Sequence, residues 1–260
     1  MTRIITIAMQ KGGVGKTTSA VNLAAALVEL RQRVLAVDLD PQCNLTEHLG
    51  FNPEELSSTV YQVLQAEING QPPHIEDAIY PTAEGFHLLP SQPELSLVEL
   101  ALMNTLSRER VLSTLLEPIT PRYDFILIDC NPSLGLLVVN ALTAATSVLI
   151  PVQTEYLAAR GANMVLSTID TIKRKRLNPD LKVEGILLTM ADTRTLLTRD
   201  VLSAIEQQFQ GRLPILQPVI KRSVRFAESA VAGQSILAYE PHGAGANAYR
   251  AIAQEILRHE

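Results

Sequence analysis

The stretch RIITIAMQKGGVGKTTSAVNLAAALVEL, residues 3–30, decides the fold of this 260-residue chain. It opens with an apolar, β-branched run over 3–9 and continues through a glycine-rich turn into an alanine-rich segment, in which we expect a helix over 17–32. A strand, a glycine turn and a helix in that order bring backbone N–H groups and the positive end of the helix to one point. The sequence therefore predicts a phosphate-binding loop after a central strand.

The residue types in QKGGVGKTT, residues 10–18, fit a bound nucleotide. Glycines let backbone N–H groups face phosphate oxygens, Lys16 reaches the β- and γ-phosphates, and Thr17 offers a hydroxyl to Mg²⁺. The strict pattern GxxxxGK[ST] needs glycine where this chain has Gln10. We expect the nucleotide to be held by Gly12, Gly13, Val14, Gly15, Lys16, Thr17 and Thr18.

Carboxylates end two other expected strands. Asp38 and Asp40 close the run 33–40, and Asp129 closes the apolar run 124–129. Ligands bind at the carboxyl ends of strands in open α/β sheets, and phosphoryl transfer needs groups that hold Mg²⁺ and orient water. A carboxylate at the end of a buried strand is costly unless it is paired or near a metal, which favours Asp129 as a magnesium residue. Asp38 and Asp40 also fit a helix cap or a turn, since Pro41 follows.

Strands and helices alternate along the rest of the chain. Residues 41–85 are less regular, a short strand is expected at 85–90, and one or two helices at 94–119. The later expected elements are a helix from about 135, strand 148–152, helix 154–176, strand 183–190, helix 201–209, strand 213–220, and helices from about 223 and over about 247–258. This alternation predicts an α/β fold, a single doubly wound, mostly parallel sheet with helices on both faces. No repeat or linker interrupts it, so we expect one domain over 1–260.

Composition excludes several classes of protein. A hydrophobic share of 47% with 19% charged residues suits a large core and excludes a disordered chain. Two cysteines, Cys43 and Cys130, are too few for a disulfide framework or a four-cysteine metal site. The start lacks the features of a secretory signal. The charge-free stretch between Asp129 and Glu155 is long enough to cross a bilayer, but its prolines and polar residues favour a buried helix and strand. We expect a soluble, cytoplasmic protein.

The loop and several distant segments together resemble the ParA/MinD family of dimeric ATPases, whose Walker A motif is deviant. The resemblance is carried, in the family's order and over nearly the whole chain, by KGGVGKTT (11–18), VDLDPQ (37–42), FILIDCNPSLG (125–135), PVQTEYLAARG (151–161), GILLTM (185–190) and PVIKRSVRFAES (218–229). It is closest to small, Soj-like ParA partition proteins, and the carboxysome-positioning members look similar.

That resemblance implies a P-loop ATPase with ATP and Mg²⁺ as cofactors. It implies a homodimer that sandwiches two ATP molecules, with Lys11 reaching the partner's nucleotide as an arginine finger would. Asp38 would assist the Mg²⁺ shell, Asp40 would orient the attacking water, and Asp129 would contact Mg²⁺ through water. Cys130 stands where many fast ATPases carry glutamate, so hydrolysis is expected to be weak and stimulated by a partner and by DNA.

The resemblance also implies contacts late in the chain. Adenine would pack on Met190 and Pro218, within a region that includes Asp192 and runs to Lys221. Glu155 would contact the partner's nucleotide, although a surface glutamate at a helix start would look the same.

Net charge is uneven along the chain, −8 over residues 1–150 and +3 over 151–260, for a total of −5. Partition ATPases of the resembling family bind DNA without sequence specificity, and phosphate contacts would make such binding fall with salt. The implied DNA-binding residues are Arg194, Arg199, Lys221, Arg222 and Arg225, with the run 173–176 as a further candidate. Solvated helix surfaces carry such residues too.

We therefore expect a nucleoid-associated ATPase that segregates or positions a plasmid, a chromosome or a carboxysome, with a ParB-like or cargo-adaptor protein stimulating hydrolysis. The alternative is a MinD-like membrane-cycling ATPase, which needs a C-terminal amphipathic helix as lipid anchor. Here Tyr249, Ile252 and Ile256 have the spacing of a helix packed on a core, so no membrane partner is expected. Absence of paired cysteines excludes an iron–sulfur carrier.

Overall fold

The computed structural model describes residues 2–155, 158–192, 194–209 and 211–259, and it contains one eight-stranded sheet. The strand order is β3-β4-β2-β5-β1-β6-β7-β8, and every pairing is parallel except that of β3 with β4 at one edge. The bounds are β1 Arg3–Ile7, β2 Val34–Leu39, β3 Tyr80–Pro81, β4 His87–Leu89, β5 Phe125–Cys130, β6 Ser147–Gln153, β7 Lys182–Thr189 and β8 Ile215–Leu216. The predicted central strand is confirmed, because β1 lies between β5 and β6.

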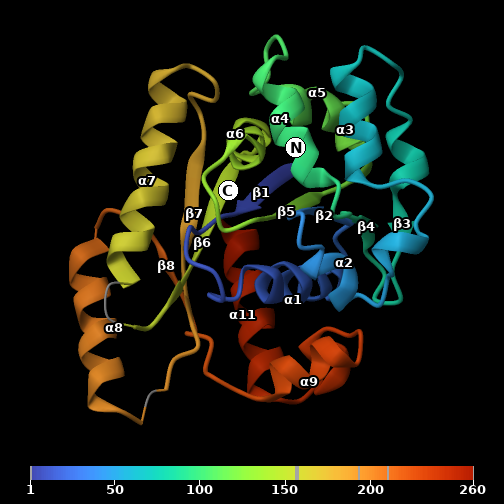
Figure 1. Ribbon diagram of the computed structural model, residues 1–260. Helices are drawn as coiled ribbons and strands as arrows, with labels where there is room; N and C mark the ends of the chain where they lie inside the picture. Colours follow the sequence, from blue (N-terminus) through green and yellow to red (C-terminus); the bar gives the residue numbers. More distant parts are fainter. Residues whose placement is uncertain (1, 156–157, 193, 210, 260) are drawn as a thin grey trace.

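Helices cover both faces of this sheet, as predicted (Figure 1). One face carries α3 (Val60–Ile68), α4 (Leu95–Met103), α5 (Val111–Leu116), α6 (Leu136–Ala144), α7 (Ala158–Arg174) and α8 (Leu196–Phe209). The other carries α1 (Lys16–Glu29), α2 (Asn44–His48), α10 (Ile236–Tyr239) and α11 (Ala244–Arg258), with α9 (Arg225–Val231) nearby.

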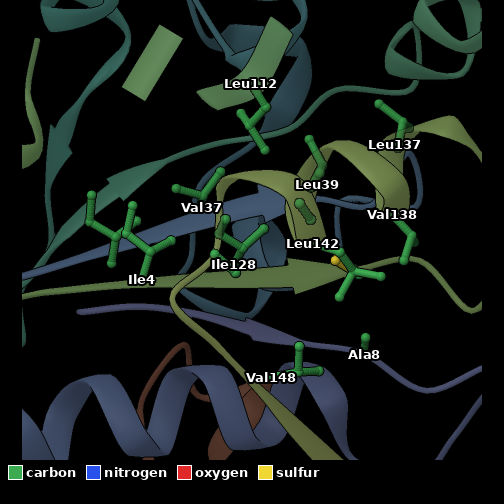
Figure 2. Close-up of a cluster of buried hydrophobic side chains, with 14 of the residues drawn as sticks. Ile4, Ala8, Val37, Leu39, Leu112, Ile128, Leu137, Val138, Leu142 and Val148 are labelled. Carbon is green, nitrogen blue, oxygen red and sulfur yellow. The ribbon is translucent and has the colours of Figure 1, made fainter. Parts of the chain in front are cut away.

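Alternation along the strands explains the two layers. Ile4 of β1 faces the first layer, whereas Ile5 and Ile7 face the second, because successive side chains of a strand point to opposite faces. Figure 2 shows the first core, in which Ile4, Val37 and Ile128 meet Leu142 and other residues of the covering helices. Both cores are continuous along the central strands, which keeps the carboxyl ends of the strands in fixed register.

Several expected bounds differ from the structure. The strand expected over 213–220 is reduced to two residues, because Pro214 and Pro218 lack the N–H that a ladder needs. The long helix begins at Ala158 and not near 154, since β6 continues to Gln153; residues 156–157 lie outside the described ranges. Strand β3 and helix α10 are too short to leave a periodic pattern, and neither was predicted.

The charge-free stretch between Asp129 and Glu155 forms α6 and β6. Across the four described ranges, none of the helices combines the length and apolarity that a bilayer crossing requires. Helix α11 buries Tyr249, Ile252 and Ile256 in the second core, as their spacing predicts.

Candidate functional site

The glycine-rich loop joins β1 to α1 and is held by hydrogen bonds from two other segments. Gly13 and Gly15 have φ values of +72° and +86°, a left-handed conformation that side chains disfavour. The Thr189 hydroxyl at the end of β7 donates to the Val14 carbonyl at 2.9 Å, and the Ser19 hydroxyl donates to the Gly15 carbonyl at 2.6 Å. The loop is therefore preformed at the first turn of α1.

A cleft of about 670 Å³ opens at this loop, a size suited to a nucleotide. Eight of the predicted nucleotide and catalytic residues line it: Gly12, Gly13, Gly15, Lys16, Thr17, Thr18, Asp40 and Met190. Val14 is buried beside it, and Pro218 is exposed and not among the lining residues that the structure describes. Met190 itself has a left-handed φ of 54°, and the neighbouring Ala191 pairs with Lys221.

Asp129 offers a free oxygen beside the loop. It is fully buried at the end of β5, where its Oδ2 accepts a hydrogen bond from the Thr17 hydroxyl at 2.6 Å. Its Oδ1 is also buried and has no hydrogen-bond partner among the described residues. Burial, together with repulsion from Asp38, raises the pKa of Asp129 to about 8.

A bound cation explains the unpartnered oxygen of Asp129 better than a purely structural role for this carboxylate does. Mg²⁺ is bound by one or two carboxylates with waters and substrate phosphates. Within the described ranges, no three histidine, cysteine or acidic side chains group closely enough to hold a metal unaided. Asp129 and Thr17 would supply the protein ligands, and a bound nucleotide with water would supply the rest.

Asp38 lies directly opposite Asp129 in the β2–β5 pairing. Its Oδ1 accepts from the Asp40 N–H at 3.1 Å, and its Oδ2 accepts from the Thr46 N–H at 2.9 Å and hydroxyl at 2.7 Å. Burial raises the pKa of Asp38 to about 7, although the hydrogen bonds from Thr46 and Asp40 act to lower it. The structure thus brings Asp38 beside the candidate magnesium residue, with both of its oxygens already accepting hydrogen bonds.

Asp40 is only 5% exposed, and what it exposes faces the cleft. Its Oδ1 accepts from the Gln42 N–H at 2.9 Å, which closes a turn after β2. Of the two carboxylates that end this strand, Asp40 is the one that lines the cleft.

Lys11 and Glu155 contact each other within one chain. The Lys11 ammonium lies 2.5 Å from Glu155 Oε2 and 3.2 Å from Gln153 Oε1. Both charged side chains are half-exposed and neither lines the cleft. Such an exposed pair is weak, so Lys11 is free to exchange Glu155 for another anion.

The basic candidates fall into separate places. Lys221 forms a β-bridge with Ala191, and the Arg222 N–H donates to the Ala191 carbonyl, so both residues lie beside the end of β7 near Asp192. Arg194 pairs with Asp192 at 2.9 Å, and Arg225 pairs with Glu228 at 2.8 Å. Arg199 is exposed in the first half of α8. The run 173–176 lies at the end of α7 and precedes the amino end of β7. It is therefore near the amino ends of the strands, whereas the cleft lies at their carboxyl ends.

Sequence reasoning missed seven of the residues that line the cleft: Gln42, Asn44, Glu47, His48, Pro132, Ala230 and Val231. The first four follow the acidic end of β2. Their position in the chain could have predicted that they line the cleft, because ligands bind beyond the carboxyl ends of strands in such sheets. Ala230 and Val231 carry no chemistry that a sequence pattern would reveal. His48 also links α2 to the far side of the cleft, because its Nε2 lies 3.0 Å from the Gln234 carbonyl.

Comparisons with known proteins agree with this geometry. A family model described as an AAA domain matches residues 2–183. The chromosome partitioning protein ParA of Myxococcus xanthus is 41% identical over 99% of this chain and 89% of its own length. The sporulation initiation inhibitor protein Soj of Bacillus subtilis is 42% identical over 98% of each chain.

Among solved structures, one described as cobyrinic acid a,c-diamide synthase from Mycobacterium smegmatis, with bound ADP and magnesium, superposes with a TM-score of 0.85. The two sequences are 40% identical, and the superposition covers 100% of this chain and 95% of the solved one. The similarity therefore extends through the glycine-rich loop, the acidic strand ends and the last helix.

Proposed function

The chain belongs to the AAA-domain family of ParA and Soj partition ATPases, and on this premise we propose that it is an ATP-switched positioning protein. In the proposed cycle, two copies sandwich two ATP molecules and the dimer binds DNA without sequence preference. Weak hydrolysis, stimulated by DNA and by a ParB-like or cargo-adaptor protein, then releases the dimer. The cargo is a plasmid, a chromosome or a protein body such as a carboxysome, and the cycle operates in the cytoplasm on the nucleoid.

The observation that carries this proposal is the arrangement of three groups around one cleft. The loop offers backbone N–H groups and Lys16 to the cleft, and Asp40 faces the same space. Thr17 also lines the cleft, and its hydroxyl donates to Asp129, which is fully buried, is not among the lining residues that the structure describes, and carries an unpartnered oxygen. These are the parts that phosphoryl transfer needs: a phosphate cradle, a magnesium site and a group that orients water. When bound, Mg²⁺ would neutralise charge on the phosphates. We propose that Asp38 assists that shell from beside Asp129.

Lys11 supports the dimeric part of the proposal. It is half-exposed outside the cleft of its own chain and is held there by an exposed ion pair with Glu155 and a hydrogen bond to Gln153. A lysine so placed is available to a nucleotide in a second copy, where it would stabilise the transferring phosphate. We propose that Glu155, which holds Lys11 in the monomer, then lies at the partner's nucleotide. Met190 and the region of Pro218 would flank adenine.

Arg194, Arg199, Lys221, Arg222 and Arg225 are the proposed DNA contacts. Lys221 and Arg222 are exposed at the end of β7, beside the cleft residue Met190. Because Ala191 follows Met190 in the chain and forms a β-bridge with Lys221, ATP bound beside Met190 would alter the position of Lys221 and Arg222. Arg225 must first exchange its carboxylate partners for phosphates.

The test is DNA binding by the purified chain with ATP, with ADP and without nucleotide, on two unrelated duplexes across about 50–300 mM salt. We expect binding with ATP only, equal on both duplexes and falling steeply with salt. Lys11→Ala should abolish it, whereas Lys182→Ala, a matched lysine at the amino edge of β7, should not. An ATP-dependent dimer that retains no DNA at low salt would refute the DNA-binding part, and its recruitment to anionic vesicles would favour the membrane-cycling alternative.

A further inference from the structure

We propose that Ser91 and Thr46 are positioning residues that hold Asp40 in the orientation required for ATP hydrolysis. The inference rests on the proposed function, because it assumes that Asp40 orients the attacking water. Neither residue lines the cleft, so any effect on the reaction must pass through the residues that they hold, Asp40 and its neighbour Asp38.

The backbone of Asp40 is held on both sides. Its N–H donates to Asp38 Oδ1 at 3.1 Å, and its carbonyl accepts from the Ser91 hydroxyl at 2.8 Å and from the Cys43 N–H at 2.9 Å. With both peptide groups fixed, the direction in which the Asp40 side chain leaves the chain is fixed too. Among the described residues, the Gln42 N–H is the group that donates a hydrogen bond to the carboxylate itself.

Thr46 joins these two supports into one network. Its hydroxyl donates to Asp38 Oδ2 at 2.7 Å and accepts from the Ser91 N–H at 2.9 Å. Thr46 and Ser91 are both fully buried, so water cannot replace either hydrogen bond. A buried network in which every member is paired has one low-energy arrangement. Losing the Thr46 hydroxyl takes away the acceptor of the Ser91 N–H, and losing the Ser91 hydroxyl leaves the Asp40 carbonyl with the Cys43 N–H as its donor.

The segment that carries Ser91 is itself anchored to the start of α3. The Val60 N–H donates to the Pro90 carbonyl at 2.8 Å. The side-chain oxygen of Gln92 accepts from the Thr59 hydroxyl at 2.9 Å and from the Gln62 amide at 2.8 Å. Ser91 therefore has fixed neighbours on both sides, and it transmits the position of β4 and α3 to Asp40.

The expected consequence concerns rate and not binding. A displacement of about 1 Å between a catalytic group and its reactant lowers a rate by up to about 100-fold. The loop and Lys16, which bind phosphates, do not depend on this network. Removing the Ser91 hydroxyl should therefore slow hydrolysis while ATP affinity stays the same.

The first experiment compares Ser91→Ala with Ser96→Ala, a matched change in the same β4–α4 segment. The Ser96 hydroxyl is exposed and donates to the Pro93 carbonyl, outside the network. We expect Ser91→Ala to lower the single-turnover hydrolysis rate about tenfold or more, with the dissociation constant for ATP changed less than about twofold. Ser96→Ala should alter neither, and thermal unfolding confirms that both variants are folded.

The second experiment asks whether the effect passes through Asp40. In an Asp40→Asn background, Ser91→Ala should cause little further loss, because residues that act through one group are not additive. Thr46→Ser keeps the hydroxyl and should retain most of the rate, whereas the isosteric Thr46→Val should lose it as Ser91→Ala does.

Three results would overturn the proposal: an unchanged rate in folded Ser91→Ala, a full further loss in the Asp40→Asn background, or a loss matched by equally weakened ATP binding. A wild-type chain that binds no ATP, or never hydrolyses it, would instead refute the proposed function on which this inference depends. The two failures are distinguished by the wild-type measurement alone.

Discussion

Replacing Asp129 by asparagine should stabilise the nucleotide-free protein at pH 8 and weaken its stabilisation by Mg²⁺–ATP. Burial raises the pKa of Asp129 to about 8 from an ordinary value of 3.8, and repulsion from Asp38 adds to the rise. The folded state therefore keeps a proton that the unfolded chain releases. Between these two pKa values stability falls as pH rises, because the folded state binds more protons than the unfolded one.

The magnitude follows from the same two values. A difference of about four pKa units corresponds to about 5 kcal/mol once the pH passes the folded pKa. Asparagine keeps an acceptor for Thr17 but adds an N–H₂ group that must find partners of its own, at a cost of about 1–3 kcal/mol. We expect Asp129→Asn to raise the free energy of unfolding by about 2–4 kcal/mol at pH 8, and by less at pH 6.

Urea denaturation of both proteins at fixed pH values from 6 to 9 measures this difference. Asp124→Asn is the control: hydrogen bonds from Arg33 lower the pKa of Asp124 to about 2, so its contribution is constant above pH 5. That partly exposed pair is worth at most about 1 kcal/mol. Saturating Mg²⁺–ATP should stabilise wild type, through binding to the folded state alone, more than Asp129→Asn. A variant less stable than wild type at pH 8, or a difference independent of pH, would refute the reasoning.

Three further changes have expected outcomes. Lys11→Ala should alter monomer stability by less than about 1 kcal/mol, since its pair with Glu155 is half-exposed, yet sedimentation should show no ATP-dependent dimer; a dimer that persists contradicts the role of Lys11 in trans. Gly15→Ala should cost about 1–2 kcal/mol through its φ of +86° and weaken binding of a fluorescent ATP analogue, and unaltered affinity would argue against a preformed loop. Asn22 is fully buried and accepts from the Ile236 N–H, so Asn22→Ala should cost about 1–3 kcal/mol in urea denaturation, and a loss under about 0.5 kcal/mol would show that the site relaxes.

The pattern of the sequence was sufficient for the sheet and for the phosphate loop. Alternating apolar strands and helices predicted the doubly wound sheet with β1 at its centre, and the glycines with Lys16 and Thr17 predicted the cleft. These signals are local: the residues that make a strand, a turn or a helix start are neighbours in the chain. The short elements β3 and α10 were missed because two to four residues are too few to show a period. The length of β8 was misjudged because Pro214 and Pro218 confine it to two residues of a longer apolar run.

The positions of Asp38 and Asp40 in the sequence placed both at a strand end, but only the tertiary structure decided which one faces the cleft. Asp38 is enclosed by hydrogen bonds from Thr46 and Asp40, while Asp40 faces the cleft. Ser91, 51 residues away, holds the Asp40 carbonyl because β4 and β2 pair. The sequence does not reveal the hydrogen-bond partner of a serine hydroxyl, because that partner depends on which distant strand ends the fold brings together. The sequence by itself predicted the phosphate-binding loop, and the packing of the strands determined which carboxylate faces the cleft beside that loop.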